Sequence, residues 1–430
     1  MSEKYKIGLS RNRLFEFDNA VVFCGRPAEG HVEKLNKALK LLSLKEPVIT
    51  AVAKFCENGE CYLETESVIP GVSLSELSSD EVKHSFSLNG VDFRRRLFEF
   101  VMSVDGYLII AAHTLVADCK SLLRLAIELS DICENEAKSV LPSGMEMFGD
   151  MTTLPMEVNS PLTDKLSAEL DSGWQRKART FDAEDYDNAQ KYYAEMRKFS
   201  REVKVDLDSV FTAQLKSFCV DNRVDLSSVI AFAFYRTLQE ELDPPRKHGK
   251  ICIHADRRFF LSDDSLQIGP FNGFCEASLS EKERKLALSD QIKAFHLSCY
   301  KGVTSPFRTF YDEVLLMKVS PSYCDSSHMY LAGLVKDKAS KKLAQNYGCM
   351  NAQLCEFFSC NFEQEYWHGL KSYNDISVAE PMKSRFAANV SLIMVDGGCK
   401  ISVKFNNSRI DEAHHIAIID KVKRFLNEVK

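Results

Sequence analysis

Short apolar segments typical of strands alternate with segments of helical periodicity along the chain, and this alternation limits the possible folds most. Residues 19–24 (Asn-Ala-Val-Val-Phe-Cys) have strand character, and residues 30–43 carry apolar side chains at helical spacing. An Asp-Gly pair at 105–106 separates two further strand patterns, 98–104 and 107–113. The sequence therefore predicts a mixed α/β protein.

The second half shows the same alternation without repeating the sequence. The remaining expected strands cover 47–55, 61–66, 251–255, 355–361, 390–395 and 400–406, and the remaining expected helices cover 121–135, 210–222, 225–240, 283–301 and 411–429. Between the halves, 142–161 holds three prolines and predicts a loop, and 173–201 predicts a charged, solvated helix. We expect an N-terminal lobe (1–165), a charged linker and helix (166–205) and a C-terminal lobe (206–430).

Charge and hydropathy exclude several classes of function. The 430 residues carry a net charge of −6, which argues against a nucleic-acid partner. The most apolar stretches, 107–117 and 229–235, are too short to span a bilayer, and the N-terminus lacks the apolar core of a signal peptide. We therefore expect a cytoplasmic protein without a membrane partner.

The fourteen cysteines are scattered through the chain, unlike the dense framework of a small secreted scaffold. Cys56 and Cys61 flank an expected hairpin tip, and Cys355 and Cys360 lie five apart on an expected strand, where they face opposite ways. These pairs are unsuited to a shared zinc site. We expect reduced, mostly buried cysteines and no metal.

The most informative segment follows the strand pattern that ends at His113. A short loop leads to Asp118, and a helix that Ser121 could cap begins directly after it. A titratable ring at the end of a strand and a carboxylate at the start of a helix are arrangements common in functional sites. Without other information, a His near an Asp is more often a structural pair.

This segment resembles the signature of the condensation-domain, or chloramphenicol-acetyltransferase-like, superfamily of acyltransferases, which includes the condensation domains of nonribosomal peptide synthetases. The signature is two consecutive histidines, three residues, Asp and usually Gly, often with Ser two residues later. In an ungapped alignment, His113 and Thr114 take the two His positions, and Asp118, Cys119 and Ser121 take the Asp, Gly and Ser positions.

Weaker similarities extend over nearly the whole chain in the order expected for the superfamily. Residues 11–17 and 93–104 precede the motif. In the second half, Asp-Arg-Arg at 256–258 resembles the Asp-x-Arg strand, Ile-Gly-Pro-Phe at 268–271 resembles the Gly-x-Phe turn, and Ser-Cys-Asn-Phe at 359–362 resembles the Ser-Asn segment near the channel. None of these matches is specific alone, but their common order is.

The resemblance implies two chloramphenicol-acetyltransferase-like lobes, each a mixed sheet flanked by helices, around a central channel. It implies a thioester donor (acyl-CoA, or the phosphopantetheine of an acyl or peptidyl carrier protein) and a small amine or alcohol acceptor. The product is an amide or ester, and no cofactor is needed. Cys119, Ser121 and Asn361 are the candidate channel-lining residues. Asp118 is expected to form a structural ion pair with Arg258, or alternatively with Arg257.

Thr114 is the main departure from the signature, because the second His of the superfamily is credited with accepting or positioning the acceptor's proton. A threonine hydroxyl cannot take up a proton near pH 7, and a positioned general base contributes roughly 10²–10⁴ in rate. His113 and Thr114 are the candidate catalytic residues. Neighbouring strand residues point to opposite faces, so His113 either packs within the first lobe or reaches the channel through a twist in the loop.

Two further alternatives remain. Heterocyclising condensation domains carry Asp-x4-Asp-x2-Ser, and this chain has His113-x4-Asp118-x2-Ser121 at the same spacing. The protein is expected either to be an acyltransferase or to be a catalytically silent relative that binds an acyl chain, a carrier protein or a partner subunit.

Overall fold

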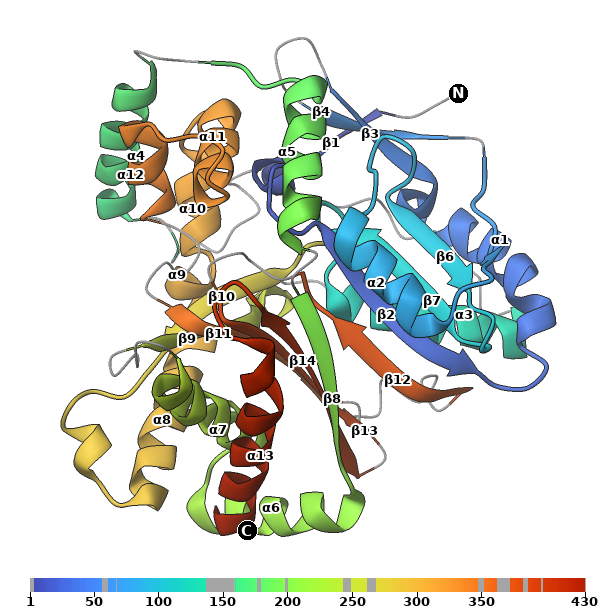
Figure 1. The fold of residues 1–430 in the computed structure, drawn as a ribbon. Helices are drawn as coiled ribbons and strands as arrows, with labels where there is room; N and C mark the ends of the chain where they lie inside the picture. Colours follow the sequence, from blue (N-terminus) through green and yellow to red (C-terminus); the bar gives the residue numbers. More distant parts are fainter. Residues whose placement is uncertain are drawn as a thin grey trace.

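Two β-sheets flanked by helices form the frame of the protein in the computed structural model (Figure 1). The structure describes residues 4–55, 61–66, 68–136, 158, 160–175, 179–197, 200–242, 249–260, 268–346, 352–361, 372–381, 386–395 and 397–429. The mixed α/β fold predicted from the alternating patterns is confirmed.

The first sheet has five strands in the order β12-β2-β7-β6-β5, and a small three-stranded sheet, β1-β4-β3, accompanies it. The strands are β2 (Ala20–Pro27), β5 (Ser73–Leu74), β6 (Phe98–Met102), β7 (Leu108–His113) and β12 (Tyr373–Ala379), with β1 (Lys4–Lys6), β3 (Ala51–Phe55) and β4 (Cys61–Thr65) in the small sheet. The antiparallel β2–β7 pair sets Ala20 opposite His113, so the motif leaves the sheet at this end.

The second sheet has six strands in the order β10-β9-β11-β13-β14-β8. They are β8 (Ser200–Leu207), β9 (Lys250–Asp256), β10 (Asn272–Ala277), β11 (Ala352–Asn361), β13 (Ala388–Val395) and β14 (Gly398–Asn406). β11 is parallel to both of its neighbours. Its pairing with β9 ends at Phe357 and Ile253, whereas both strands continue, β9 against β10 and β11 against β13. The two strands therefore separate inside the sheet.

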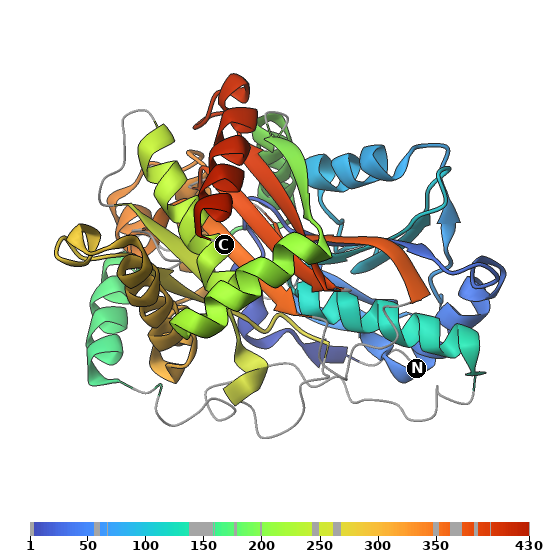
Figure 2. The same cartoon turned by 90° about the horizontal axis from the view of Figure 1, so that it is seen from below.

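Helices cover both sheets. They are α1 (Leu35–Lys45), α2 (Ser79–Asn89), α3 (Cys119–Glu134), α4 (Pro161–Trp174), α5 (Ala183–Arg197), α6 (Ser209–Asn222), α7 (Leu226–Glu241), α8 (Leu288–Val303), α9 (Pro306–Thr309), α10 (Tyr311–Met317), α11 (Pro321–Leu331), α12 (Lys338–Ala344) and α13 (Glu412–Val429). α3 packs its apolar stripe into the core of the first sheet, and the second core lies between the second sheet and α6, α7, α8 and α13. Figure 2 shows α13 (dark red) beside α7 (yellow-green).

Segments of the second half complete the first sheet. β12 lies within the range 206–430 expected for the C-terminal lobe, yet it pairs antiparallel with β2. The helices α10, α11 and α12 lie near α4 (Figure 1). A buried bidentate pair joins α11 to the N-terminal 3-10 helix η1 (Gly8–Arg13), because Asp325 accepts two 2.8 Å hydrogen bonds from Arg11. The sequential division at 206 therefore does not separate the two sheets.

Three local predictions are wrong. Residues 47–50, expected to open the strand 47–55, form a 3-10 helix, and the strand β3 begins only at Ala51. The stretch 173–201 was expected to be a solvated helix, but its helix, α5, buries Tyr186, Tyr193 and Arg197 against the rest of the chain. Ser121 does not cap α3, because Asp118 occupies the N-cap and accepts from the Ser121 amide. The expected loop 142–161 lies almost wholly outside the described residues.

None of the helices in the described part of the chain combines the length and apolar character that crossing a bilayer requires. The described residues also contain no group of three or more His, Cys, Asp or Glu placed to hold a metal ion. The twelve cysteines within the described ranges are all buried, as expected.

Candidate functional site

The predicted motif lies where the two halves of the chain meet. After β7 ends at His113, the loop brings Asp118 to the N-cap of α3, where its Oδ1 accepts hydrogen bonds of 2.8 Å from both the amide and the hydroxyl of Ser121. Ser121 Oγ in turn contacts the backbone of Gly269: it accepts from the amide at 3.0 Å and lies 2.9 Å from the carbonyl, which is the alternative acceptor for its single proton. The predicted Ile-Gly-Pro-Phe turn therefore contacts the motif directly.

Asp118 and Arg258 form a bidentate ion pair across the two halves. Arg258 Nη1 lies 2.9 Å from Asp118 Oδ2, Nη2 lies 3.0 Å from Oδ1, and both side chains are at most 3% exposed. Phe271 donates its amide to Asp118 Oδ2. Although burial disfavours a charged guanidinium, Asp118 and Asp256 hold the pKa of Arg258 above its ordinary value. Arg257, the alternative partner, pairs with Glu313 instead.

His113 is packed inside the first half. Its ring is fully buried and meets Phe93 edge to face at 5.6 Å, and its Nδ1 accepts from the Leu115 amide at 3.1 Å. Burial lowers the pKa of His113 to about 3. A ring with so low a pKa is a weak proton acceptor at neutral pH.

Between about pH 6 and pH 4, we expect His113 to lower the free energy of unfolding by about 1.4 kcal/mol per pH unit of acidification. The unfolded ring takes up a proton near its ordinary pKa, whereas the folded ring stays neutral down to about pH 3, so this stability is lost as the pH falls. Urea denaturation of His113→Asn, which keeps an acceptor for Leu115, is expected to depend less steeply on pH than that of the wild type. Equal slopes would contradict a neutral, buried His113.

The other motif positions are equally enclosed. Thr114 is buried, and its Oγ1 has no hydrogen-bond partner within the described ranges. Cys119 donates its amide to Glu380 Oε1 at 3.2 Å, and burial raises the pKa of its thiol well above the ordinary value. Asn361 ends β11, but its side chain lies outside the described residues. Neither cavity described below is lined by His113, Thr114, Cys119 or Ser121.

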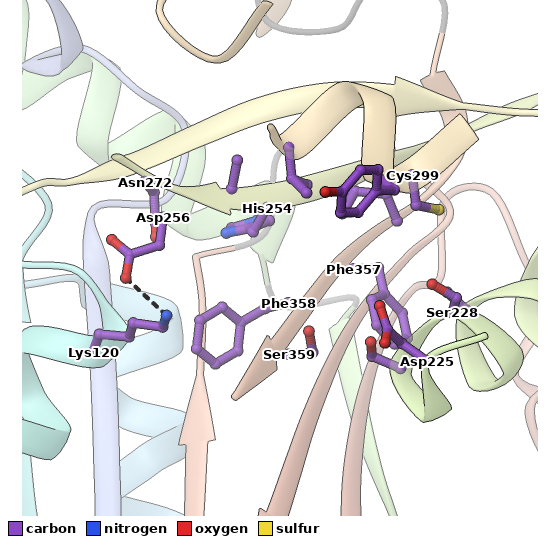
Figure 3. Close-up of a pocket in the computed structure, with 16 residues that line it drawn as sticks. Lys120, Asp225, Ser228, His254, Asp256, Asn272, Cys299, Phe357, Phe358 and Ser359 are labelled. Carbon is purple, nitrogen blue, oxygen red and sulfur yellow. Dashed lines mark hydrogen bonds and ion pairs between the residues drawn. The ribbon is translucent and has the colours of Figure 1, made fainter. Parts of the chain in front are cut away.

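A cavity of about 240 Å³ lies where β9 and β11 separate (Figure 3). Its wall is formed by the diverging strands, by α7 and α8, and by the first turn of α3. The lining residues are Lys120, Asp225, Ser227, Ser228, Ala231, Ile253, His254, Ala255, Asp256, Asn272, Cys299, Tyr300, Val303, Phe357, Phe358 and Ser359. Lys120 from the motif helix pairs with Asp256 at 2.8 Å, the contact dashed in Figure 3. The motif thus reaches this cavity through Lys120.

His254 and Glu356 form a buried pair beside this cavity. His254 Nε2 lies 3.0 Å from Glu356 Oε1, and the side chains are 4% and 1% exposed. Glu356 also accepts from Asn389 Nδ2 at 3.3 Å. Phe274 and Phe358 meet the imidazole edge to face, with ring centroids 4.9 and 5.8 Å away, so the ring is fixed by packing as well as by charge.

A second cavity, of about 470 Å³, is lined by Lys83, Lys204, Lys404, Glu202, Glu380, Asn389 and further side chains from α2, β2, β12, β13 and β14. Two polar contacts connect its wall to that of the first cavity. Asn272 donates to Glu380 at 2.9 Å, and Asn389 contacts Glu356, the partner of His254. Burial raises the pKa of Glu380, against hydrogen bonds from Cys119 and Asn272.

Sequence reasoning did not single out His254, Glu356, Glu380 or Lys120. One signal was available for the histidine, since it lies two residues before Asp256 on an expected strand and so shares its face. Nothing in the sequence indicated its partner.

The comparisons with solved structures agree over the full length of the chain. The epimerization domain from the third module of tyrocidine synthetase B matches with a TM-score of 0.63 and 14% identity, over 100% of this chain and 97% of that one. The condensation domain of the monacolin K polyketide synthase MokA matches at 0.61 and 10%, over 99% and 97%. Trichothecene 15-O-acetyltransferase from Fusarium sporotrichioides matches at 0.63 and 11%, over 100% and 96%.

The protein has the condensation-domain fold. At these identities the likeness concerns the fold alone, and neither a protein-family model nor a curated protein matches the sequence. Within this condensation-type fold, the sequence expectation of two lobes with mixed sheets is confirmed, and the Asp118–Arg258 pair lies where the lobes meet.

Proposed function

We propose that the protein is an acyltransferase that moves an acyl group from a thioester to an amine or alcohol. The observation that carries this proposal is that the Asp118–Arg258 pair joins α3 to the second half of the chain and that Lys120 of α3 lines the cavity between β9 and β11. In the reaction the acceptor's nitrogen or oxygen attacks the thioester carbonyl carbon, the carbon–sulfur bond breaks, and the proton lost by the acceptor passes to the leaving thiolate. The products are an amide or ester and a free thiol.

Both coenzyme A and a carrier-protein phosphopantetheine present the same thioester, so either can be the donor. Support for a carrier-protein donor comes from the fold, which is shared by domains of tyrocidine synthetase B and of a four-domain nonribosomal peptide synthetase. The acceptor class is proposed from the same fold likeness to an acetyltransferase.

A second candidate function is binding without catalysis. Thr114 occupies the second His position, and the pKa of His113 is lowered to about 3 by burial, so the motif itself lacks a proton acceptor suited to neutral pH. A protein of this kind would retain the fold to hold an acyl chain, a carrier protein or a partner subunit. Proximity alone can contribute roughly 7–11 kcal/mol to lowering a barrier, which is why we prefer the enzyme.

The test measures thiol released from a panel of acyl-CoA and acyl-carrier thioesters, quantified chromatographically, with and without mixed amine and alcohol acceptors. We expect acceptor-dependent release by the wild type, and we expect His113→Ala to retain it if it folds. Thr114→His should change the rate little, because Thr114 lines neither described cavity. If the wild type releases no thiol but Thr114→His does, the protein is an enzyme that has lost its activity. If no thiol is released from any donor, the binding function is favoured.

A further inference from the structure

The cavity beside the motif contains a group that the motif lacks. Among the residues that line this cavity, His254 is the one histidine, and it comes from β9 in the second half of the chain. Its side chain is buried, and neither ring nitrogen has an aligned hydrogen-bond partner within the described ranges; Nε2 faces a carboxylate, whereas Nδ1 faces none at ion-pair distance. A buried, unpartnered ring nitrogen in a cavity wall is unusual, because buried polar atoms are normally hydrogen-bonded.

The opposite ring nitrogen, Nε2, lies within ion-pair distance of a carboxylate. Glu356 Oε1 contacts Nε2 at 3.0 Å, and Asn389 holds the other carboxylate oxygen, Oε2. A carboxylate in this position favours the tautomer with the proton on Nε2, which leaves the Nδ1 lone pair open to accept a proton. It also stabilises the imidazolium that forms when Nδ1 is protonated.

Other titratable groups near the motif are less suited to this task. His113 is a weak base, the Cys119 thiol is kept protonated by burial, and Glu380 is occupied by hydrogen bonds from Cys119 and Asn272. Lys120 and Asp256 neutralise each other in an ion pair. His254 therefore remains as the unoccupied proton acceptor in the cavity wall.

We propose that His254, positioned by Glu356, is the base that takes the proton from the acceptor during acyl transfer. This inference rests on the proposed function. The acceptor nitrogen or oxygen forms a bond to the thioester carbonyl carbon while His254 Nδ1 takes its proton. The tetrahedral intermediate then collapses, the carbon–sulfur bond breaks, and the imidazolium returns the proton to the thiolate. The base is thus supplied from the second half instead of from the Thr114 position.

A purely structural role of the His254–Glu356 pair must be distinguished from a role in proton transfer, because the pair also joins β9 to β11. Loss of a structural pair would lower stability and the fraction of folded protein, and it would leave the kcat of the folded fraction nearly unchanged. Loss of a base lowers kcat with little change in KM, and it can be compensated by a small base added from solution.

The experiment measures acceptor-dependent thiol release by the wild type, His254→Gln, His254→Ala, Glu356→Gln and a control, His31→Gln, each checked for folding. His31 lies in neither cavity and is partly exposed. We expect His254→Gln to lower kcat by roughly 10²–10⁴ while KM changes by less than about threefold. Glu356→Gln should lower kcat less, and His31→Gln should match the wild type.

Chemical rescue provides a readout that a structural role would not move. We expect imidazole to restore turnover to His254→Ala in proportion to its concentration, with more basic methylimidazoles restoring more. The pH dependence of kcat reflects the charged groups around His254 as well as His254 itself. These groups are Glu356, Asp256, Lys120, Asp225 and Glu380. Provided that the wild type is active, either of two results overturns the inference about His254 and leaves the proposed function standing. One is a kcat of His254→Gln within about threefold of the wild-type value, and the other is a folded His254→Ala that no imidazole rescues. A wild type that shows no acceptor-dependent thiol release overturns the proposed function and this inference with it.

Discussion

Replacing Asp118 by alanine is expected to lower the free energy of unfolding by about 3–5 kcal/mol, because it leaves the Arg258 guanidinium buried without its carboxylate. The substitution also removes the acceptor for the amides of Ser121 and Phe271, so the α3 N-cap is lost with the ion pair. Urea denaturation at neutral pH measures the change.

The matched control is Asp92→Ala. Asp92 also pairs with an arginine, Arg94, but both side chains are about one-third exposed, so we expect a loss of no more than about 1 kcal/mol. The double variant Asp118→Ala/Arg258→Met should recover part of the loss, since no charge then remains buried. A loss for Asp118→Ala no larger than that of the control would contradict a structural ion pair.

This prediction affects how activity data should be interpreted. A variant of Asp118 that is inactive because it is partly unfolded says nothing of a chemical role for this carboxylate. Activity must therefore be normalised to the folded fraction before any motif residue is assigned a part in the reaction.

Replacing Glu313 by alanine is expected to lower the free energy of unfolding by at least about 3–5 kcal/mol, because one buried carboxylate serves two buried arginines. Glu313, on α10, accepts from Arg13 of η1 at 2.6 Å and pairs with Arg257, which directly follows β9. Arg257 also donates to the carbonyl of Thr309. Removing the carboxylate leaves both cations in the interior, in three segments that are distant in sequence.

The contribution of Glu313 to the free energy of unfolding depends on pH in a defined direction. Burial tends to raise the pKa of Glu313, but Arg257 and Arg13 outweigh it and hold the pKa below its ordinary value. The stability from this carboxylate is therefore complete at neutral pH and is lost as the pH falls through its folded pKa. Thermal denaturation should show this acid dependence in the wild type and a weaker one in Glu313→Ala.

The control for this variant is Glu136→Ala, which breaks an ion pair with Lys37 whose side chains are both more than half exposed. We expect a change of less than about 1 kcal/mol. If Glu313→Ala costs no more than this surface pair, the buried cluster does not hold the N-terminal segment to α10.

Much of the local structure follows from the sequence because periodicity and turn residues act over a few positions. The strand of 19–24, the strand ending at His113, the following helix and the terminal helix were all predicted close to their observed bounds. β8, β10 and β12 were missed. β8 does carry a strand signal, since Val203, Val205 and Leu207 alternate with charged residues, but the charged stretch before it predicts one long helix. β10 and β12 mix polar or small residues with apolar ones and show little strand signal. Their conformation depends on the strands beside them.

The sequence by itself determined the mixed α/β class, the position of the motif at the end of a strand, and the absence of a second histidine at Thr114. Only the tertiary structure decided that β12 pairs with the first sheet, that His113 is buried against Phe93, and that His254 pairs with Glu356 beside a cavity. The reason is physical. A period or a cap is encoded by neighbours in the chain, whereas the partner of a buried charge is selected by packing among segments that are far apart in the sequence.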